Sequence, residues 1–284
     1  MFFDWMKWFP ENVSTFGVGV DALFEVIYLL CIGIFFLVFG LGIYFIIKYR
    51  FSPTRKAYHY HGNNLIEFTW TLLPTLLFAG LGVYSDGMWE DAKYKNVFPK
   101  GDLEVEVLGQ TYLWNYRYAG ADGQFGKTDR SLMSAANPFG IDPNDPFGKD
   151  DITTVNQMHA PVNKNIRIHL SSVDVLHSYF LPNMRLKQDA VPGSWVDIWY
   201  NATKTGKYEL ACAELCGSGH YAMRGEVFID SQTDFDKWMD QQMMAKMPKS
   251  TQVANAPAPV TPTVDTTATT VPQDSVAQNG GSAR

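Results

Sequence analysis

The sequence of 284 residues carries a formal net charge of -6, and its lysines and arginines form no dense cluster. Nucleic-acid binding needs a concentrated positive surface, so this charge pattern argues against nucleic acid and favours a basic partner. Hydrophobic residues make up 46% of the chain, enough for a buried core, but they are unevenly distributed along it.

The first predicted elements are two membrane spans. The stretch from Val26 to Ile47 contains no charged residue and is long enough, as a helix, to cross a hydrocarbon core. The stretch from Phe68 to Ser85 is also free of charge, although it is shorter and contains Pro74. Each could instead be the core helix of a soluble protein, but two such stretches close together favour a transmembrane hairpin.

The loop between the spans, residues 48–64, carries four basic residues and no acidic one. The positive-inside rule therefore makes this loop cytoplasmic and places both termini outside. The N-terminus lacks the features of a removable secretion signal. We expect an outer N-terminal segment over residues 1–19 and a helix hairpin over residues 20–86.

The periodicity changes after the hairpin, in the segment 87–248. Apolar Leu103, Val105 and Val107 alternate with Glu104 and Glu106, which is typical of a strand. The same alternation recurs in NIRIHLSS, SWVDIWYNA, GKYELACAE and RGEVFID. The pattern predicts an antiparallel, all-β sandwich or barrel.

Three other segments of the exported part depart from this alternation. Residues 119–156 contain six aspartates against three basic residues and are too long for a hairpin connection, so we expect a functional or a mobile loop. Helical spacing predicts one packed helix in DFDKWMDQQMMAKM, through Phe235, Trp238, Met239 and Met243. Residues 249–284 have few large apolar side chains and are predicted to be a disordered tail.

The segment CAELCGSGHYAM, from Cys212 to Met223, holds two of the three cysteines of the chain. A disulfide is the ordinary expectation for paired cysteines outside the membrane. A zinc site would recruit a second histidine but leave Met223 unused, and a blue copper site needs only one cysteine. With His220 and Met223 close by, the two thiolates form a soft donor set that suits two copper ions sharing both sulfurs.

A further ligand must come from elsewhere in the chain. His59 and His61 lie on the cytoplasmic loop, His169 is expected to face solvent, and His159 precedes a strand. His177, which we expect in a loop entering an aromatic turn, is the best candidate, with a hydrogen-bonded core histidine as the alternative. Cys31 lies alone in the first span, where packing is its expected role.

Together these residues resemble subunit II of the heme-copper cytochrome c oxidases, in the bacterial form without a fused cytochrome c domain. The match covers roughly residues 20–118 and 156–240 and rests on EFTWTLLP, WNYRY, DVLHSYFLPNMRLKQDAVPG and CAELCGSGHYAM. The resemblance implies a membrane-anchored all-β protein: a two-transmembrane-helix hairpin followed by a cupredoxin-like Greek-key β-barrel. It also implies a bacterial inner membrane, with the copper domain on the periplasmic side.

The resemblance also implies a binuclear copper centre, CuA. Its expected ligands are the side chains of His177, Cys212, Cys216, His220 and Met223 and the backbone carbonyl of Glu214. The carboxylate of Glu214 would share a magnesium ion with subunit I, since Mg²⁺ prefers oxygen ligands.

Four further residues acquire roles from the resemblance. Glu67 matches the glutamate at the cytoplasmic mouth of a proton path, with an ordinary helix-end charge as the alternative. Tyr112 stands where the family has the tryptophan that receives electrons, and Trp114 follows two residues later; both could instead be packing aromatics. Asp174 matches an acidic donor-docking residue, whereas Val173 replaces an acid common beside it.

We therefore expect the electron-accepting subunit of a proton-pumping cytochrome c oxidase, which passes electrons to heme in subunit I for the reduction of oxygen to water. Expected partners are subunits I and III, membrane lipid, and cytochrome c or a membrane-bound donor such as alternative complex III. The acidic insertion 119–156 would compensate for the missing docking acid or clamp such a donor. Alternatives are the CuA subunit of a nitric oxide or nitrous oxide reductase, a quinol oxidase subunit, and a membrane-tethered copper carrier.

Overall fold

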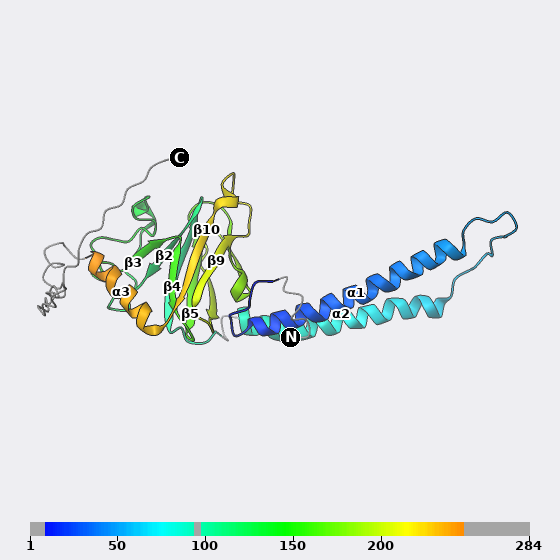
Figure 1. The fold of residues 1–284 in the computed structure, drawn as a ribbon. Coiled ribbons are helices and arrows are strands. Elements are labelled where there is room, and N and C mark those ends of the chain that lie inside the picture. Colours follow the sequence, from blue (N-terminus) through cyan, green and yellow to red (C-terminus); the bar gives the residue numbers. More distant parts are fainter. Residues whose placement is uncertain (1–8, 94–97, 247–284) are drawn as a thin grey trace, which may run out of the picture. The chain divides into compact units, whose positions relative to one another are not determined.

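The computed structural model describes residues 9–93 and 98–246 (Figure 1). The tail predicted over residues 249–284 and the first eight residues of the chain lie outside the described residues.

Two long helices, α1 (Gly17–Lys48) and α2 (Asn64–Lys93), contain the two predicted spans and run side by side (Figure 1). Both are long and apolar enough to cross a membrane. At 1.5 Å per residue, the 32 residues of α1 extend beyond a hydrocarbon core of about 30 Å. Helix α2 begins after Asn63, whose Oδ1 accepts hydrogen bonds from the amides of Leu65 and Ile66.

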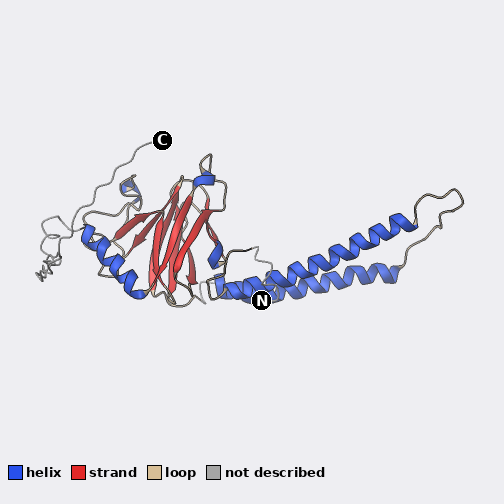
Figure 2. Cartoon of the chain, viewed as in Figure 1, coloured by secondary structure: helices blue, strands red, loops and turns tan. Residues whose placement is uncertain are grey.

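The segment after the hairpin forms two five-stranded sheets (Figure 2). The first sheet has the order β3-β2-β1-β5-β8, from β1 (Leu103–Gln110), β2 (Leu113–Tyr118), β3 (Ile152–Val155), β5 (Asn165–Ser172) and β8 (Val196–Asn201). The second has the order β4-β10-β9-β6-β7, from β4 (Gln157–Pro161), β6 (His177–Leu181), β7 (Leu186–Ala190), β9 (Gly206–Cys212) and β10 (Arg224–Asp230). The five predicted strand segments correspond to β1, β5, β8, β9 and β10.

The sheets are mixed, so the predicted all-β sandwich is confirmed but its predicted antiparallel pairing is wrong for two pairs of strands. Strand β1 pairs in parallel with β5, and β4 pairs in parallel with β10. Alternation of side chains identifies a strand but carries no information about the direction of its neighbour, which depends on crossovers between the sheets.

Both sheets contribute aromatic side chains to one core. Trp114, Tyr116, Tyr118, Tyr179 and Tyr200 are fully buried. Burying one large apolar side chain contributes about 1.5–3 kcal/mol, so this cluster is a major part of the stability of the domain. The predicted terminal helix is confirmed as α3 (Gln232–Lys246), and its Trp238 packs edge-on against Tyr118 with 5.2 Å between ring centroids.

The acidic insertion packs onto the first sheet through a buried arginine. Nε of Arg117, near the end of β2, donates to Asp151 Oδ2 at 2.9 Å, and its Nη1 donates to Glu106 at 2.8 Å. The rings of Phe125 and Phe139, both in the insertion, lie 5.2 and 5.9 Å from the guanidinium carbon. Arg117 is fully buried, and a buried charge left without its partner is costly, so this ion pair holds the insertion against the sheet. The short helix η1 (Arg130–Leu132) also belongs to the insertion.

Candidate metal centre

The cysteine-containing loop joins the antiparallel strands β9 and β10. Cys212 is the last residue of β9, and Met223 directly precedes β10. The amide of Cys212 donates to the carbonyl of Met223 at 3.1 Å, which closes the base of the loop. A short helix, η3 (His220–Ala222), turns His220 back toward the base. The strand ladder thus holds both ends of the loop in place.

The loop brings four of the predicted ligand side chains together, and a fifth arrives from β6. The two Sγ atoms lie 3.9 Å apart, and neither cysteine forms a disulfide. Cys216 Sγ lies 3.6 Å from Nδ1 of His220 and 3.7 Å from Sδ of Met223. Cys212 Sγ lies 3.9 Å from Nδ1 of His177. Each thiol therefore has one imidazole nitrogen beside it.

The backbone of Glu214 completes the donor set. The Cys212 thiol donates to the Glu214 carbonyl at 3.2 Å, so that oxygen faces the sulfurs. The side chain of Glu214 is exposed. The residue thus presents its carbonyl to the site and leaves its carboxylate accessible from outside the chain.

These donors lie in a site that is largely closed to water. His177, Cys212, Cys216 and Met223 are all buried. Burial, together with the neighbouring Cys212 thiol, raises the pKa of the Cys216 thiol to about 11. Two thiolates are therefore costly here unless a cation supplies the compensating charge. The ligand atoms of His177, Cys212 and Cys216 all lie within 4.8 Å of one another, and soft sulfur with imidazole fits a copper centre.

His177 is the first residue of strand β6, rather than part of the loop that we predicted. Tyr179 of β6 pairs with Cys212 of β9, so His177 lies two residues along the same face and projects beside the cysteine. Cys212, on the pairing strand β9, lies 35 residues after His177 in the sequence. The sequence pattern around His177 alone therefore did not reveal that it belongs to a strand.

Tyr112 and Trp114 occupy opposite environments. Tyr112 is 37% exposed, and its ring lies against the cysteine-containing loop, called the ligand loop below. The contact is so close that a Cβ added to Gly219 of this loop would lie 2.6 Å from ring atom Cε2. Its hydroxyl lies 3.2 Å from Ser218 Oγ. Trp114 is fully buried and packs edge-on toward His177, with ring centroids 5.9 Å apart. Of the two aromatic candidates, Tyr112 alone lies at the surface.

Asp174 turns its carboxylate inward, toward His177. Its Oδ1 lies 2.9 Å from Nε2 of His177 and accepts from the amide of Val175 at 2.8 Å. Its Oδ2 accepts from the amide of Thr111 at 2.9 Å and from the Thr111 hydroxyl. Burial alone would raise the pKa of Asp174, but these hydrogen bonds outweigh it and hold that pKa well below its usual value. Sequence patterns had no signal for the part played by Thr111.

The remaining candidates lie apart from this cluster. Glu67 is exposed in the first turn of α2, and His59 and His61 lie on the loop between the helices. His169 was predicted to face solvent but is half-buried, because Asp197 on the paired strand β8 lies opposite it, with Nδ1 2.7 Å from Oδ1. His159 stacks between Phe228 and Trp238 and approaches Asp230 Oδ2 at 2.7 Å.

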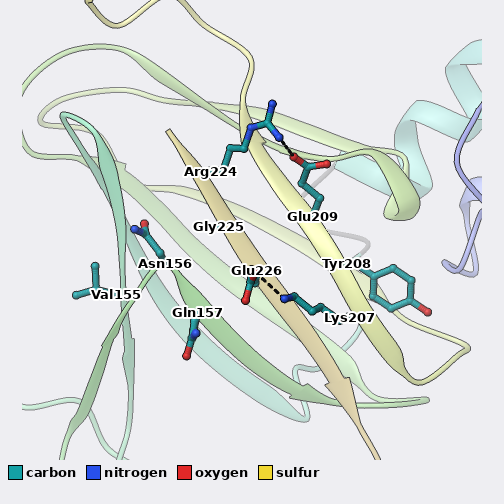
Figure 3. A pocket seen from close by; sticks show the side chains of 9 residues that line it. All are labelled: Val155, Asn156, Gln157, Lys207, Tyr208, Glu209, Arg224, Gly225 and Glu226. Atoms are coloured by element: carbon teal, nitrogen blue, oxygen red, sulfur yellow. Dashed lines mark ion pairs between the residues drawn. The ribbon is translucent and has the colours of Figure 1, made fainter. Parts of the chain in front are cut away.

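A groove along β4, β9 and β10 is lined mostly by charged and polar side chains, in contrast to the buried sulfur and imidazole cluster (Figure 3). Two ion pairs cross it, Lys207–Glu226 at 2.6 Å and Arg224–Glu209 at 2.9 Å. None of the predicted copper ligands is among its lining residues.

Fold and site together define a membrane-anchored, cupredoxin-like protein with a soft-metal loop. Comparison with known families makes this more specific. The family described as cytochrome C oxidase subunit II matches residues 103–230 with its periplasmic domain and residues 3–86 with its transmembrane domain. This chain belongs to the cytochrome c oxidase subunit II family, and the resemblance inferred from its motifs is confirmed.

Two curated relatives agree with this assignment. The chain is 31% identical over 239 residues to "Alternative cytochrome c oxidase subunit 2" of Bradyrhizobium diazoefficiens, covering 83% of this chain and 84% of that protein. It is 31% identical over 266 residues to "Cytochrome c oxidase subunit 2" of Thermostichus vulcanus, covering 84% and 80%. A similar solved structure is the periplasmic domain of subunit II of cytochrome oxidase of Bradyrhizobium japonicum, at 29% identity and TM-score 0.40, over 53% of this chain and 99% of that one.

Proposed function

We propose that this chain receives electrons at a binuclear copper centre and passes them to heme in subunit I of a proton-pumping cytochrome c oxidase. The observation that carries this proposal is the arrangement of the two buried thiols, each with its own imidazole nitrogen, at 3.9 Å for Cys212 and 3.6 Å for Cys216. A single zinc ion could take both pairs in a tetrahedral site, but it would leave the thioether of Met223, 3.7 Å from Cys216 Sγ, without a purpose, and a single blue copper ion needs only one of the two thiols. The nitric oxide or nitrous oxide reductase subunit and the copper carrier remain second to this reading because the relatives above carry the oxidase name.

The proposed ligands of the two copper ions are the side chains of His177, Cys212, Cys216, His220 and Met223 and the carbonyl of Glu214. When bound, this centre supplies one-electron transfer. The protein contributes a site whose donors are already gathered, four of them buried, so that little has to move and little water has to reorganise when the charge changes. The backbone hydrogen bond from the amide of Cys212 to the carbonyl of Met223, at the base of the loop, maintains that geometry.

Tyr112 is the proposed point at which electrons arrive. Its ring is exposed on one side and contacts the ligand loop at Gly217 and Gly219 on the other. We assign Trp114 the supporting role of packing against His177 from within the core. The proposed donor is cytochrome c or a membrane-bound cytochrome c complex such as alternative complex III.

The proposed arrangement in the membrane follows from the charges of the hairpin. The basic loop 48–64 would face the cytoplasm of a bacterial cell, with the copper domain in the periplasm. We propose limits of 20–86 for the membrane-spanning hairpin and 87–248 for the copper domain, with the helices themselves extending from Gly17 to Lys93. The exposed carboxylate of Glu214 is free to share a magnesium ion with subunit I, and subunit III and lipid would complete the surroundings of the hairpin.

The copper assignment is tested by loading the full chain, purified in detergent, with copper and recording its electron paramagnetic resonance spectrum. One unpaired electron shared by two copper nuclei is expected, with hyperfine splitting from both. A spectrum of isolated Cu(II), or a colourless protein that prefers zinc, would contradict the proposal.

Glu67 is the proposed proton-uptake residue, because it is exposed in the first turn of α2, next to the loop assigned to the cytoplasm. Replacing Glu67 by glutamine in the assembled oxidase is expected to slow turnover several-fold and leave the copper spectrum unchanged, since a neutral amide cannot take up a proton. Glu25→Gln, in α1 at the other end of the hairpin, is the matched control. Equal turnover in the Glu67 and Glu25 variants would retire this role.

A further inference from the structure

Asp174 connects two parts of the site that come from different turns. Thr111 and Tyr112 lie in the turn between β1 and β2, whereas Asp174 lies in the turn between β5 and β6 and His177 begins β6. The carboxylate accepts two hydrogen bonds from Thr111 and also faces Nε2 of His177 at 2.9 Å. A single side chain thus ties the turn that carries the exposed aromatic ring to the imidazole that faces Cys212.

The contact to His177 determines which ring nitrogen is free. Nδ1 of His177 is the atom near Cys212 Sγ, so it is the nitrogen available to bind a metal ion. Nε2 then carries the hydrogen and donates it to Asp174 Oδ1. The carboxylate therefore sets both the tautomer of the ring and its orientation. His177 is fully buried, so water cannot replace this acceptor.

The carboxylate of Asp174 also accepts hydrogen bonds from Thr111. Both oxygens of Asp174 act as acceptors, Oδ1 toward His177 and Val175 and Oδ2 toward the amide and hydroxyl of Thr111. An asparagine has only one acceptor oxygen, so its NH₂ group would face hydrogen-bond donors either at His177 and Val175 or at Thr111. The geometry therefore requires a carboxylate and not merely a polar residue of the same shape.

We propose that Asp174 is a positioning residue that aligns the exposed ring of Tyr112 and the metal-binding nitrogen of His177 as one unit. The effect of Asp174 on electron transfer rests on the proposed function. Its effect on the orientation of His177 and of the Thr111 turn concerns only residues of this chain. This role of Asp174 differs from donor docking, because the carboxylate is occupied by internal hydrogen bonds and is only 30% exposed. Its removal should disturb both the copper ligand and the approach to it.

The structural part can be tested in the metal-free chain. The full chain, labelled with ¹⁵N-histidine and held in detergent micelles, should give a His177 Nε2–H signal that exchanges slowly with water. In Asp174→Asn that signal is expected to exchange at least about 10-fold faster, since the strong acceptor is lost. Asp230→Asn is the matched control, because Asp230 faces His159 at the same kind of distance, 2.7 Å, away from the metal site. An unchanged His177 signal in Asp174→Asn would overturn the proposal.

Copper affinity and reduction potential, measured on the copper-loaded chain, provide the second test. Loss of the carboxylate is expected to weaken copper binding by about 10- to 100-fold, the usual effect of removing a partner of a ligating histidine, and to raise the reduction potential, since a negative charge that favours the oxidised centre is removed. Asp174→Glu should restore part of both. If the parent chain binds no copper pair while the exchange result holds, the proposed function fails and the positioning of His177 stands. Equal copper affinity and potential in Asp174→Asn and Asp230→Asn would overturn the positioning role.

Discussion

Replacing Cys216 by serine is expected to reduce the copper content of the chain from the proposed two ions to at most one and to abolish the proposed shared-electron spectrum. Serine keeps the size of the side chain, but its hydroxyl does not ionise near neutral pH and is a poor ligand for copper. Cys216 also lies beside both His220 and Met223, so its loss removes the donor that connects them. Electron transfer from the donor should fall by more than about 100-fold, beyond the effect of an outer residue of a metal site.

Cys31→Ser is the matched control for this experiment. Cys31 is the one cysteine outside the ligand loop and is exposed in α1. Its replacement is expected to leave copper content, spectrum and electron transfer unchanged. Two copper ions per chain in the Cys216→Ser protein, counted by elemental analysis, would show that the thiol is not a shared ligand.

Replacing Gly219 by alanine is expected to slow the arrival of electrons while the copper spectrum is retained. The backbone of Gly219 has φ of -91°, which alanine adopts without strain, so the effect is confined to the added methyl group. That methyl group would lie 2.6 Å from Cε2 of Tyr112, and the ring must move away. A displacement of about 1 Å at a reacting group can cost on the order of 100-fold, so we expect a loss of about 10- to 100-fold in donor-to-copper transfer.

Two changes at Tyr112 separate the ring from its hydroxyl. Tyr112→Phe keeps the ring against Gly219 and loses only the hydrogen bonds of the hydroxyl, which involve Ser218 and the backbone of Gly219, so its transfer rate should stay close to that of the parent chain. Tyr112→Ala should match Gly219→Ala. Rapid-mixing measurements with reduced cytochrome c, at fixed ionic strength, compare the three variants. If Tyr112→Ala is as fast as the parent chain, electrons arrive elsewhere.

The features that sequence predicted well are those encoded over short distances. An uncharged stretch is sufficient to predict α1. The side chains of Cys212, Cys216, His220 and Met223, which remain proposed ligands, lie within one loop, so their spacing in sequence already indicates that they are close together. The five strands with clear alternation were found because one face of each packs into the core.

The features that were missed depend on contacts between distant segments. The strand that begins at His177 is defined by its pairing with β7 and β9, and Thr111, which donates two hydrogen bonds to Asp174, lies in a turn 63 residues earlier. The burial of Arg117 requires Asp151 from the far end of the insertion. No periodicity within one segment can report such pairs, because each half is an ordinary polar residue when taken alone.

The buried pair of Arg117 and Asp151 has a consequence for engineering the chain. Tyr118 at the end of β2 pairs directly with Ile152 at the start of β3, so the two ends of the acidic insertion are already neighbours in an antiparallel ladder. Tyr112 precedes the opposite end of β2, about 20 Å away at the rise of a strand. Residues 119–150 are therefore the part that a tight turn or a foreign recognition module could replace, provided that β3 is kept and that Asp151 and Glu106 both remain as partners of buried Arg117.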